Sequence, residues 1–149
     1  MSPPKESIWV DPLYLDASAL VKLFVPEPES DSLNQALLGA RGVILSDLAL
    51  TEMASALGRR TREGVLTKRQ ASHLLREALQ LTASCRHVEL TPPVHRRAER
   101  LLLSLPMPIR ALDALHLATA LETGAATMVA FDQSLRAVAA SQGLFVAPF

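Results

Sequence analysis

The sequence predicts an α/β fold with a mainly parallel central β-sheet and helices on both of its faces. Short apolar runs, rich in β-branched or aromatic residues, alternate with segments long enough for helices. Strands that are separated by helices form βαβ units and pair in parallel. Four of the five runs carry no charge, which is typical of strands that helices bury from both sides.

The apolar runs give the expected strands, which are residues 13–15, 43–45, 88–90, 128–131 and 144–146. Glu89 interrupts the third run with a charge, so we expect that strand at an edge of the sheet. The expected helices are residues 18–25, 29–38, 47–60, 68–84, 94–105, 113–122 and 134–141. Pro26 and Pro28 end the first helix, because proline cannot continue its hydrogen-bond ladder. Gly124 fits the end of the helix 113–122.

The composition is that of an ordinary globular chain. It has 149 residues, 49% hydrophobic and 20% charged, with a formal net charge of zero, which excludes a disordered protein. Cys85 is the single cysteine, so neither an intrachain disulfide nor a cysteine-based zinc site can form. No apolar run approaches the roughly 20 residues of a membrane span, and the first residues lack the apolar core of a signal peptide. We therefore expect a cytoplasmic protein with no membrane partner.

Two carboxylates directly follow expected strands. Asp16 comes after residues 13–15, and Asp132 comes after residues 128–131. Ligands of open α/β sheets bind outside the carboxyl ends of the strands, so both positions are candidates for a functional site. Each aspartate could instead cap the helix that follows it. Ser18 could equally cap the first helix, which would leave Asp16 free.

Two further carboxylates lie on helix faces that are otherwise apolar or small. Glu52 has Leu48, Ala49, Ser55 and Ala56 as its neighbours one turn away. A partly exposed edge residue is the alternative interpretation of this glutamate.

Asp113 shares its helix face with His116 and two apolar residues, and it could simply complement the helix dipole. His116 could pair with Asp113, but we favour a packed core histidine that is satisfied by a hydrogen bond.

Together, these four acids indicate a metal centre. If the strands are adjacent, Asp16, Glu52, Asp113 and Asp132 converge, and their mutual repulsion requires a compensating cation. Carboxylate oxygens without cysteine or a clear set of histidines suit Mg²⁺ or Mn²⁺. Such ions activate water for the cleavage of phosphodiesters. We expect Asp16 and Asp113 to ligate directly, Glu52 to ligate or act as a base, and Asp132 to complete the site.

The sequence resembles the PIN domain, and more narrowly the VapC-type toxins of bacterial toxin–antitoxin pairs, from about residue 13 to residue 146. The matching motifs are Asp16-Ala17-Ser18-Ala19-Leu20, Ser46 with Glu52, Asp113-Ala114-Leu115-His116-Leu117-Ala118-Thr119-Ala120, and Phe131-Asp132 with Leu135. Residues 1–12 form an N-terminal extension of unassigned role outside this pattern, and residues 13–149 form the PIN-like domain. Ala130 stands where the family often has threonine, so one supporting hydroxyl is missing.

This resemblance implies a metal-dependent ribonuclease in which the four acids hold Mg²⁺ or Mn²⁺ and the Ser18 hydroxyl supports them. It implies a toxin that inhibits translation by cleaving RNA. It also implies a homodimer, able to enter a higher toxin–antitoxin assembly, and a cognate VapB-like antitoxin whose tail enters the acidic groove.

The zero net charge conceals a polarised chain. Residues 59–110 hold eleven Lys or Arg and four Asp or Glu, a balance of +7, and the remaining residues balance at −7. We predict that Arg59, Arg60 and Arg62 contact the RNA backbone, with a solvated helix face as the alternative.

Two other functions fit parts of the sequence. A phosphoaspartyl phosphatase would use Asp16 as a nucleophile, but Ser18 stands where its second aspartate belongs. A catalytically degenerate PIN module could serve as a protein-binding or dimerisation domain, although all four acids are present. Neither a P-loop nor a G-x-G-x-x-G motif occurs, so nucleotide-binding folds lack their phosphate cradle.

Overall fold

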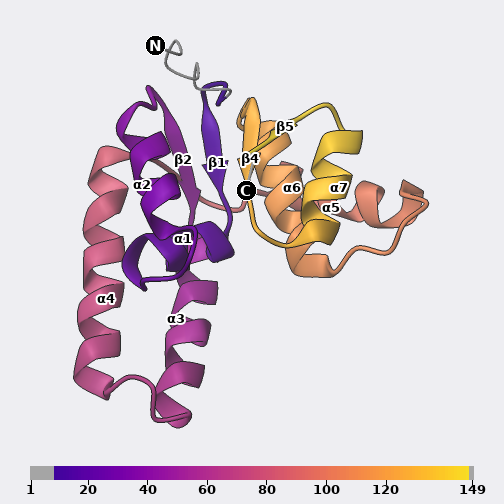
Figure 1. Cartoon of the computed structure of the whole chain (residues 1–149). Helices are drawn as coiled ribbons and strands as arrows, with labels where there is room; N and C mark the ends of the chain where they lie inside the picture. The colour runs from indigo at the N-terminus through magenta and orange to yellow at the C-terminus, as the bar shows by residue number, and fades with distance from the viewer. Residues whose placement is uncertain (1–8, 148–149) are drawn as a thin grey trace.

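Strands and helices alternate along the chain in the computed structural model, which describes residues 9–147 (Figure 1). The strands are β1 (Leu13–Leu15), β2 (Val43–Ser46), β3 (Arg86–Val88), β4 (Thr127–Val129) and β5 (Phe145–Val146). The helices are α1 (Ala17–Phe24), α2 (Ser30–Leu38), α3 (Asp47–Arg62), α4 (Lys68–Leu81), α5 (Pro92–Ser104), α6 (Ala111–Glu122) and α7 (Gln133–Ser141), with a 3₁₀ turn at Thr82–Ser84. None of the helices in residues 9–147 is long and apolar enough to cross a membrane.

The five strands form one parallel sheet in the order β3-β2-β1-β4-β5, which confirms the predicted fold class. The central strand β1 pairs with β2 on one side and with β4 on the other. The chain passes from β1 to β2 toward one edge of the sheet and from β4 to β5 toward the other edge. A topological switch point therefore lies between β1 and β4. In parallel sheets such a point opens a crevice for ligands at the carboxyl ends of the strands.

Helices cover both faces of the sheet (Figure 1). Because successive side chains of a strand point to opposite faces, β1 feeds two cores. Leu13 and Leu15 pack with residues of α1 to α4 on one face. Tyr14 packs with residues of α5, α6 and α7 on the other. All three side chains of β1 are fully buried, which explains why this run carries no charge.

Two strands have bounds that differ from the prediction by up to two residues, and β2 and β5 each differ by one residue. β3 covers residues 86–88, not 88–90, because Ile44 of β2 pairs with Arg86. This strand does lie at an edge of the sheet, as predicted, and Glu89 follows it. β4 covers residues 127–129, not 128–131, because Thr127 already pairs with Leu13. Residues 130 and 131 therefore leave the sheet before α7.

Candidate active site

Asp16 ends β1 and is nearly buried, with 5% of its surface exposed. Its Oδ1 atom accepts hydrogen bonds from the Ala19 amide at 3.0 Å and from the Ser18 hydroxyl at 2.7 Å. Asp16 is therefore the N-cap of α1, and the alternative in which Ser18 caps this helix was wrong. Within residues 9–147 no donor bonds to the second oxygen, Oδ2, which stays available to a ligand.

Burial raises the pKa of Asp16 above its ordinary value, and the charge of Glu52 raises it further. The Ala19 amide, His116 and Ser18 oppose this shift but do not cancel it. A buried carboxylate with a free oxygen and an acidic neighbour is a local excess of negative charge. The chemistry of this position therefore favours a cation.

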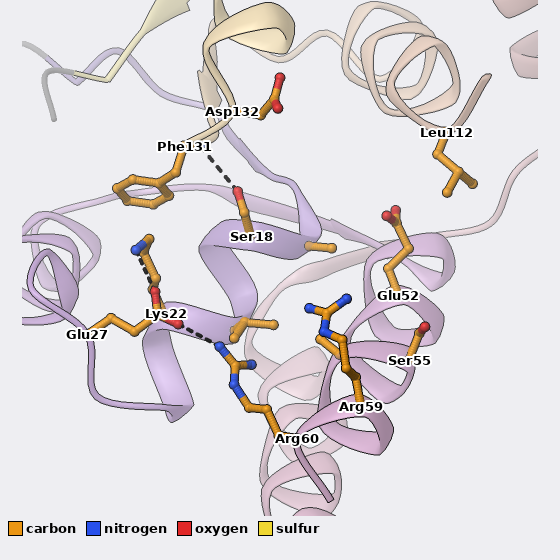
Figure 2. Close-up of a pocket in the computed structure, with 13 residues that line it drawn as sticks. Ser18, Lys22, Glu27, Glu52, Ser55, Arg59, Arg60, Leu112, Phe131 and Asp132 are labelled. Carbon is orange, nitrogen blue, oxygen red and sulfur yellow. Dashed lines mark hydrogen bonds and ion pairs between the residues drawn. The ribbon is translucent and has the colours of Figure 1, made fainter. Parts of the chain in front are cut away.

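Ser18 joins the ends of β1 and β4. Its hydroxyl donates to Asp16 and accepts from the Phe131 amide at 3.1 Å, as the dashed line in Figure 2 shows. Asp132, the next residue, caps α7 by accepting from the Leu135 amide at 2.9 Å. The two strand-end carboxylates are thus both helix caps as well as candidate ligands.

Glu52 projects from the middle of α3, and 25% of its side chain is exposed. Its Oε1 atom is hydrogen-bonded to Nε2 of His116. His116 is buried, and its Nδ1 atom lies 2.7 Å from the Tyr14 hydroxyl. The prediction of a packed histidine that is satisfied by hydrogen bonds is confirmed, but its partners are Glu52 and Tyr14, not Asp113.

Asp113 lies in the first turn of α6 and is 7% exposed. Arg110 contacts both of its oxygens, with Nε 3.1 Å from Oδ2 and Nη2 3.4 Å from Oδ1. Hydrogen bonding and the charge of Asp113 raise the pKa of Arg110, and the charges of Asp132 and Glu52 act in the same direction. One arginine therefore lies within electrostatic reach of three of the four predicted carboxylates.

A cavity of about 480 Å³ lies between α1 and α3, and two of the four carboxylates are among its lining residues (Figure 2). Glu52, Asp132 and Ser18 line it directly. Asp16 precedes the lining residue Ala17, and Asp113 follows the lining residue Leu112. The structure thus places two of the predicted acids, Glu52 and Asp132, in the cavity wall, and each of the other two next to a residue of that wall.

The donor chemistry of these four acids fits Mg²⁺ or Mn²⁺, because the candidate ligands are carboxylate oxygens without sulfur. In residues 9–147, however, no three Asp, Glu, His or Cys side chains are already grouped as the ligands of one ion. Each acid has at least one oxygen occupied by the protein, and Asp113 has both occupied by Arg110. An ion that used Asp113 would have to replace Arg110.

The three arginines predicted to contact RNA occupy different surroundings. Arg60 and Arg59 both line the cavity, whereas Arg62 lines a second cavity between α3 and α4. Arg60 bonds to Glu27 at 2.8 Å, and Glu27 also bonds to Lys22 at 2.5 Å. Arg59 points into the cavity in Figure 2 and has no ion pair with any residue in 9–147.

Sequence reasoning did not identify Arg110 or Tyr14 as parts of the site. Arg110 precedes Asp113 by three residues, a helical spacing at which opposite charges meet, so the sequence held a usable signal. Tyr14 is 102 residues from His116, and no local pattern reports that contact.

Comparisons with known proteins agree with this fold. A family model described as the PIN domain matches residues 13–141. Ribonuclease VapC49 of Mycobacterium tuberculosis is 34% identical over 138 residues, which cover 91% of this chain and 94% of that protein. The crystal structure of VapC20 from Mycobacterium tuberculosis, described as a sarcin-ricin loop cleaving toxin, matches with a TM-score of 0.71 at 20% identity, covering 91% of this chain and 99% of that one.

VapBC2 from Rickettsia felis, solved with a DNA fragment from their promoter, matches with a TM-score of 0.64 at 15% identity, covering 92% of this chain and 98% of that one. At 20% and 15% identity, these two structural matches support a shared fold only. The family model and the curated relative also establish the family, because each matches the sequence over most of its length. This chain belongs to the PIN-domain family, in the group that contains the VapC proteins.

Proposed function

We propose that this protein is a metal-dependent endoribonuclease, the toxin of a type II toxin–antitoxin pair that inhibits translation. The observation that supports the proposal is that Glu52 and Asp132 line one cavity, while Asp16 and Asp113 each adjoin a lining residue and share electrostatic neighbours with them. The curated relative's name, a ribonuclease, supports the reaction class. Because all four acids are present, a degenerate PIN module is the weaker candidate.

The four acids would hold Mg²⁺ or Mn²⁺, which supplies Lewis-acid chemistry and a nucleophilic water for in-line attack on a phosphodiester. Ser18 orients Asp16 through its hydroxyl and ties this carboxylate to the segment that carries Asp132. The caps formed by Asp16 and Asp132 hold both side chains on rigid elements. Arg110 neutralises Asp113 until a cation takes its place.

The cavity has one acidic end and one basic end, which suits an RNA strand beside a metal centre. Glu52 and Asp132 lie at the acidic end, and Arg59 lies farther along α3 (Figure 2). Lys22 and Arg60 are both paired with Glu27. Arg59 is therefore the cation of this cavity that is best able to contact a phosphate. We therefore assign backbone contact to Arg59 and a structural role to Arg60.

An antitoxin and a second copy of the chain are the further partners that we propose. The VapBC2 structure, with its promoter DNA, supports a toxin–antitoxin arrangement for proteins of this fold. A basic side chain of an antitoxin tail would replace Arg110 at Asp113, because the negative charge of Asp113 attracts a basic group as it attracts a metal ion. We propose the cytoplasm as the location of this activity, because the proposed substrate is RNA and the proposed effect is on translation.

RNA cleavage by the purified protein tests the proposal. The parent should cleave RNA with Mn²⁺ or Mg²⁺ and lose this activity in EDTA. Folded Asp16→Asn and Asp113→Asn variants should be inactive in the same assay. Cleavage that is equal in parent and variants, or unaffected by EDTA, would contradict the proposed mechanism. Sequencing of RNA ends after brief expression, with Asp16→Ala as the control, identifies the substrate.

A further inference from the structure

A line of buried polar groups runs from the centre of the sheet to Glu52. Ser46 of β2 lies 3.1 Å from the Tyr14 hydroxyl, measured from Oγ to Oη. The same hydroxyl lies 2.7 Å from Nδ1 of His116, and Nε2 of that ring is bonded to Glu52. The line therefore connects β2, β1, α6 and α3, and its last member lines the cavity.

The first three members are fully buried, with exposures of 0% for Tyr14 and Ser46 and 1% for His116. Polar groups at such positions cost stability unless they are hydrogen-bonded, and apolar residues fill most of the surrounding core. The line leaves this core and reaches a carboxylate that is 25% exposed. A core that served packing alone would not require a polar path to that carboxylate.

The orientation of the imidazole is fixed on both sides. Its ring meets the Tyr14 ring edge-on, with centroids 5.7 Å apart and planes at 66°. An ionised Glu52 can only accept hydrogen bonds, so Nε2 must carry a proton and donate it. The ring cannot turn without breaking the contact with Tyr14, the contact with Glu52, or both.

We propose that His116 is a positioning residue that holds the Glu52 carboxylate in one orientation for the metal centre, with Tyr14 and Ser46 fixing the ring from behind. Glutamate has several rotatable bonds and loses much rotamer freedom when it is held in place. His116 holds Oε1, and no donor in the described part of the chain bonds to Oε2, which stays available to a cation. This inference rests on the proposed function, because it assigns Glu52 to the metal centre.

Substitutions at His116 separate positioning from packing. His116→Leu fills most of the volume but cannot donate to Glu52. His116→Gln carries an amide N–H close to the position of Nε2, so it should restore the bond to Glu52. We expect His116→Leu to weaken Mn²⁺ binding about 10- to 100-fold, as is typical for partners of metal ligands, and His116→Gln to recover most of the loss. Tyr14→Phe should weaken Mn²⁺ binding less, because the imidazole of His116 keeps its bond to Glu52 and loses only its bond to the Tyr14 hydroxyl.

His73 provides a matched control, because its Nε2 atom also contacts a glutamate, Glu77, at 2.8 Å on the exposed face of α4. His73→Gln should leave Mn²⁺ affinity and RNA cleavage unchanged. Manganese affinity is measured by electron paramagnetic resonance of the free ion, and cleavage by kcat and KM. Loss of kcat with an unchanged KM for RNA supports positioning, whereas a His116→Leu variant that is folded and matches the parent in both assays overturns it.

Nuclear magnetic resonance of protein labelled with ¹⁵N-histidine tests the geometry without metal or RNA. We expect a protonated Nε2 on His116, protected from exchange, whose signal disappears in His116→Gln. A bare Nε2 with the proton on Nδ1 alone overturns the inference even if the protein is an active nuclease. A parent that binds no Mn²⁺ and cleaves no RNA instead overturns the proposed function, so the two failures are distinguishable.

Discussion

The candidate site has two sides that hold their carboxylates in different ways. On the strand side, Asp16 and Asp132 accept hydrogen bonds from main-chain amides three residues farther along the chain. On the helix side, Glu52 and Asp113 are held by the side chains of His116 and Arg110. Backbone donors are fixed with their helices, and the buried His116 is held by Tyr14, whereas the exposed Arg110 side chain can rotate away.

This difference indicates which half of the centre is rigid and which half responds to a ligand. The caps at Asp16 and Asp132 persist whether or not a cation is bound, because each uses only Oδ1. Asp113 has both oxygens in contact with Arg110, and the Arg110 side chain is 73% exposed. Cation binding should therefore rearrange Arg110 and Asp113 and leave the strand side and the buried His116 unchanged.

The largest expected effect is loss of cleavage in Asp16→Asn. Asparagine caps helices about as well as aspartate, so the variant should keep the cap and its thermal midpoint should not fall below that of the parent. Activity should fall by at least about 100-fold, because removing a ligand costs no less than removing the partner of a ligand. RNA cleavage and circular dichroism melting measure the two properties.

Thr67→Ala is the matched control, because Thr67 caps α4 at a distance from the candidate site. It should cost about 1 kcal/mol of stability and leave cleavage unchanged. If Asp16→Asn instead lost stability and kept its activity, Asp16 would be a cap only, and the strand side would hold no ligand.

Two adjacent arginines also differ in this way, because Arg60 is paired with Glu27 and Arg59 has no ion pair within residues 9–147. Arg59→Ala should raise KM for RNA about fivefold to tenfold and reduce the salt dependence of binding by roughly 0.7 in logarithmic slope. Arg60→Ala should instead lower stability by about 1–2 kcal/mol, because Glu27 loses one of its two half-buried cationic partners. Fluorescence anisotropy with labelled RNA at several salt concentrations distinguishes them, and equal effects of both variants on binding would remove the distinction.

A smaller effect is expected when the counter-ion on the helix side is removed. Arg110→Gln deletes a positive charge beside Asp113, so Mn²⁺ should bind up to about fivefold more tightly, the value of one exposed ion pair. Titration calorimetry at low and high salt measures the change, which should shrink with added salt. Weaker Mn²⁺ binding in this variant would show that Arg110 supports the centre and does not compete with a cation.

The smallest effect concerns the stability of the metal-free protein as pH changes. The ordinary pKa of aspartate is 3.8, and burial raises the pKa of Asp16 in the folded state. Above pH 3.8 the Asp16 carboxyl loses its proton in the unfolded chain before it does so in the folded protein. The parent therefore loses stability as pH rises from 3.8 to the folded-state pKa of Asp16, and it stays less stable at higher pH. Asp16→Asn should therefore melt increasingly above the parent over that window. A constant difference between the two melting curves at all pH values would contradict a raised pKa.

Much of the fold followed from the sequence because local patterns report it. Apolar runs identified four of the strands, whereas the run 88–90 shares only Val88 with β3, which does lie at the predicted edge of the sheet. The boundaries of β3 and β4 were wrong because pairing with a neighbouring strand, not composition, decides where a strand begins. The capping roles of Asp16 and Asp132 were within reach, since a cap bonds only a few residues away.

The sequence by itself determined which acids were available, which helices two of them cap, and which family the chain belongs to. Only the tertiary structure decided that His116 bonds to Glu52, that Arg60 bonds to Glu27, and that Arg59 lines the cavity without an ion pair to any residue in 9–147. Glu52 is 64 residues from His116, and Glu27 is 33 residues from Arg60. Contacts at such separations depend on how the elements pack against the sheet, and residue periodicity describes each element alone.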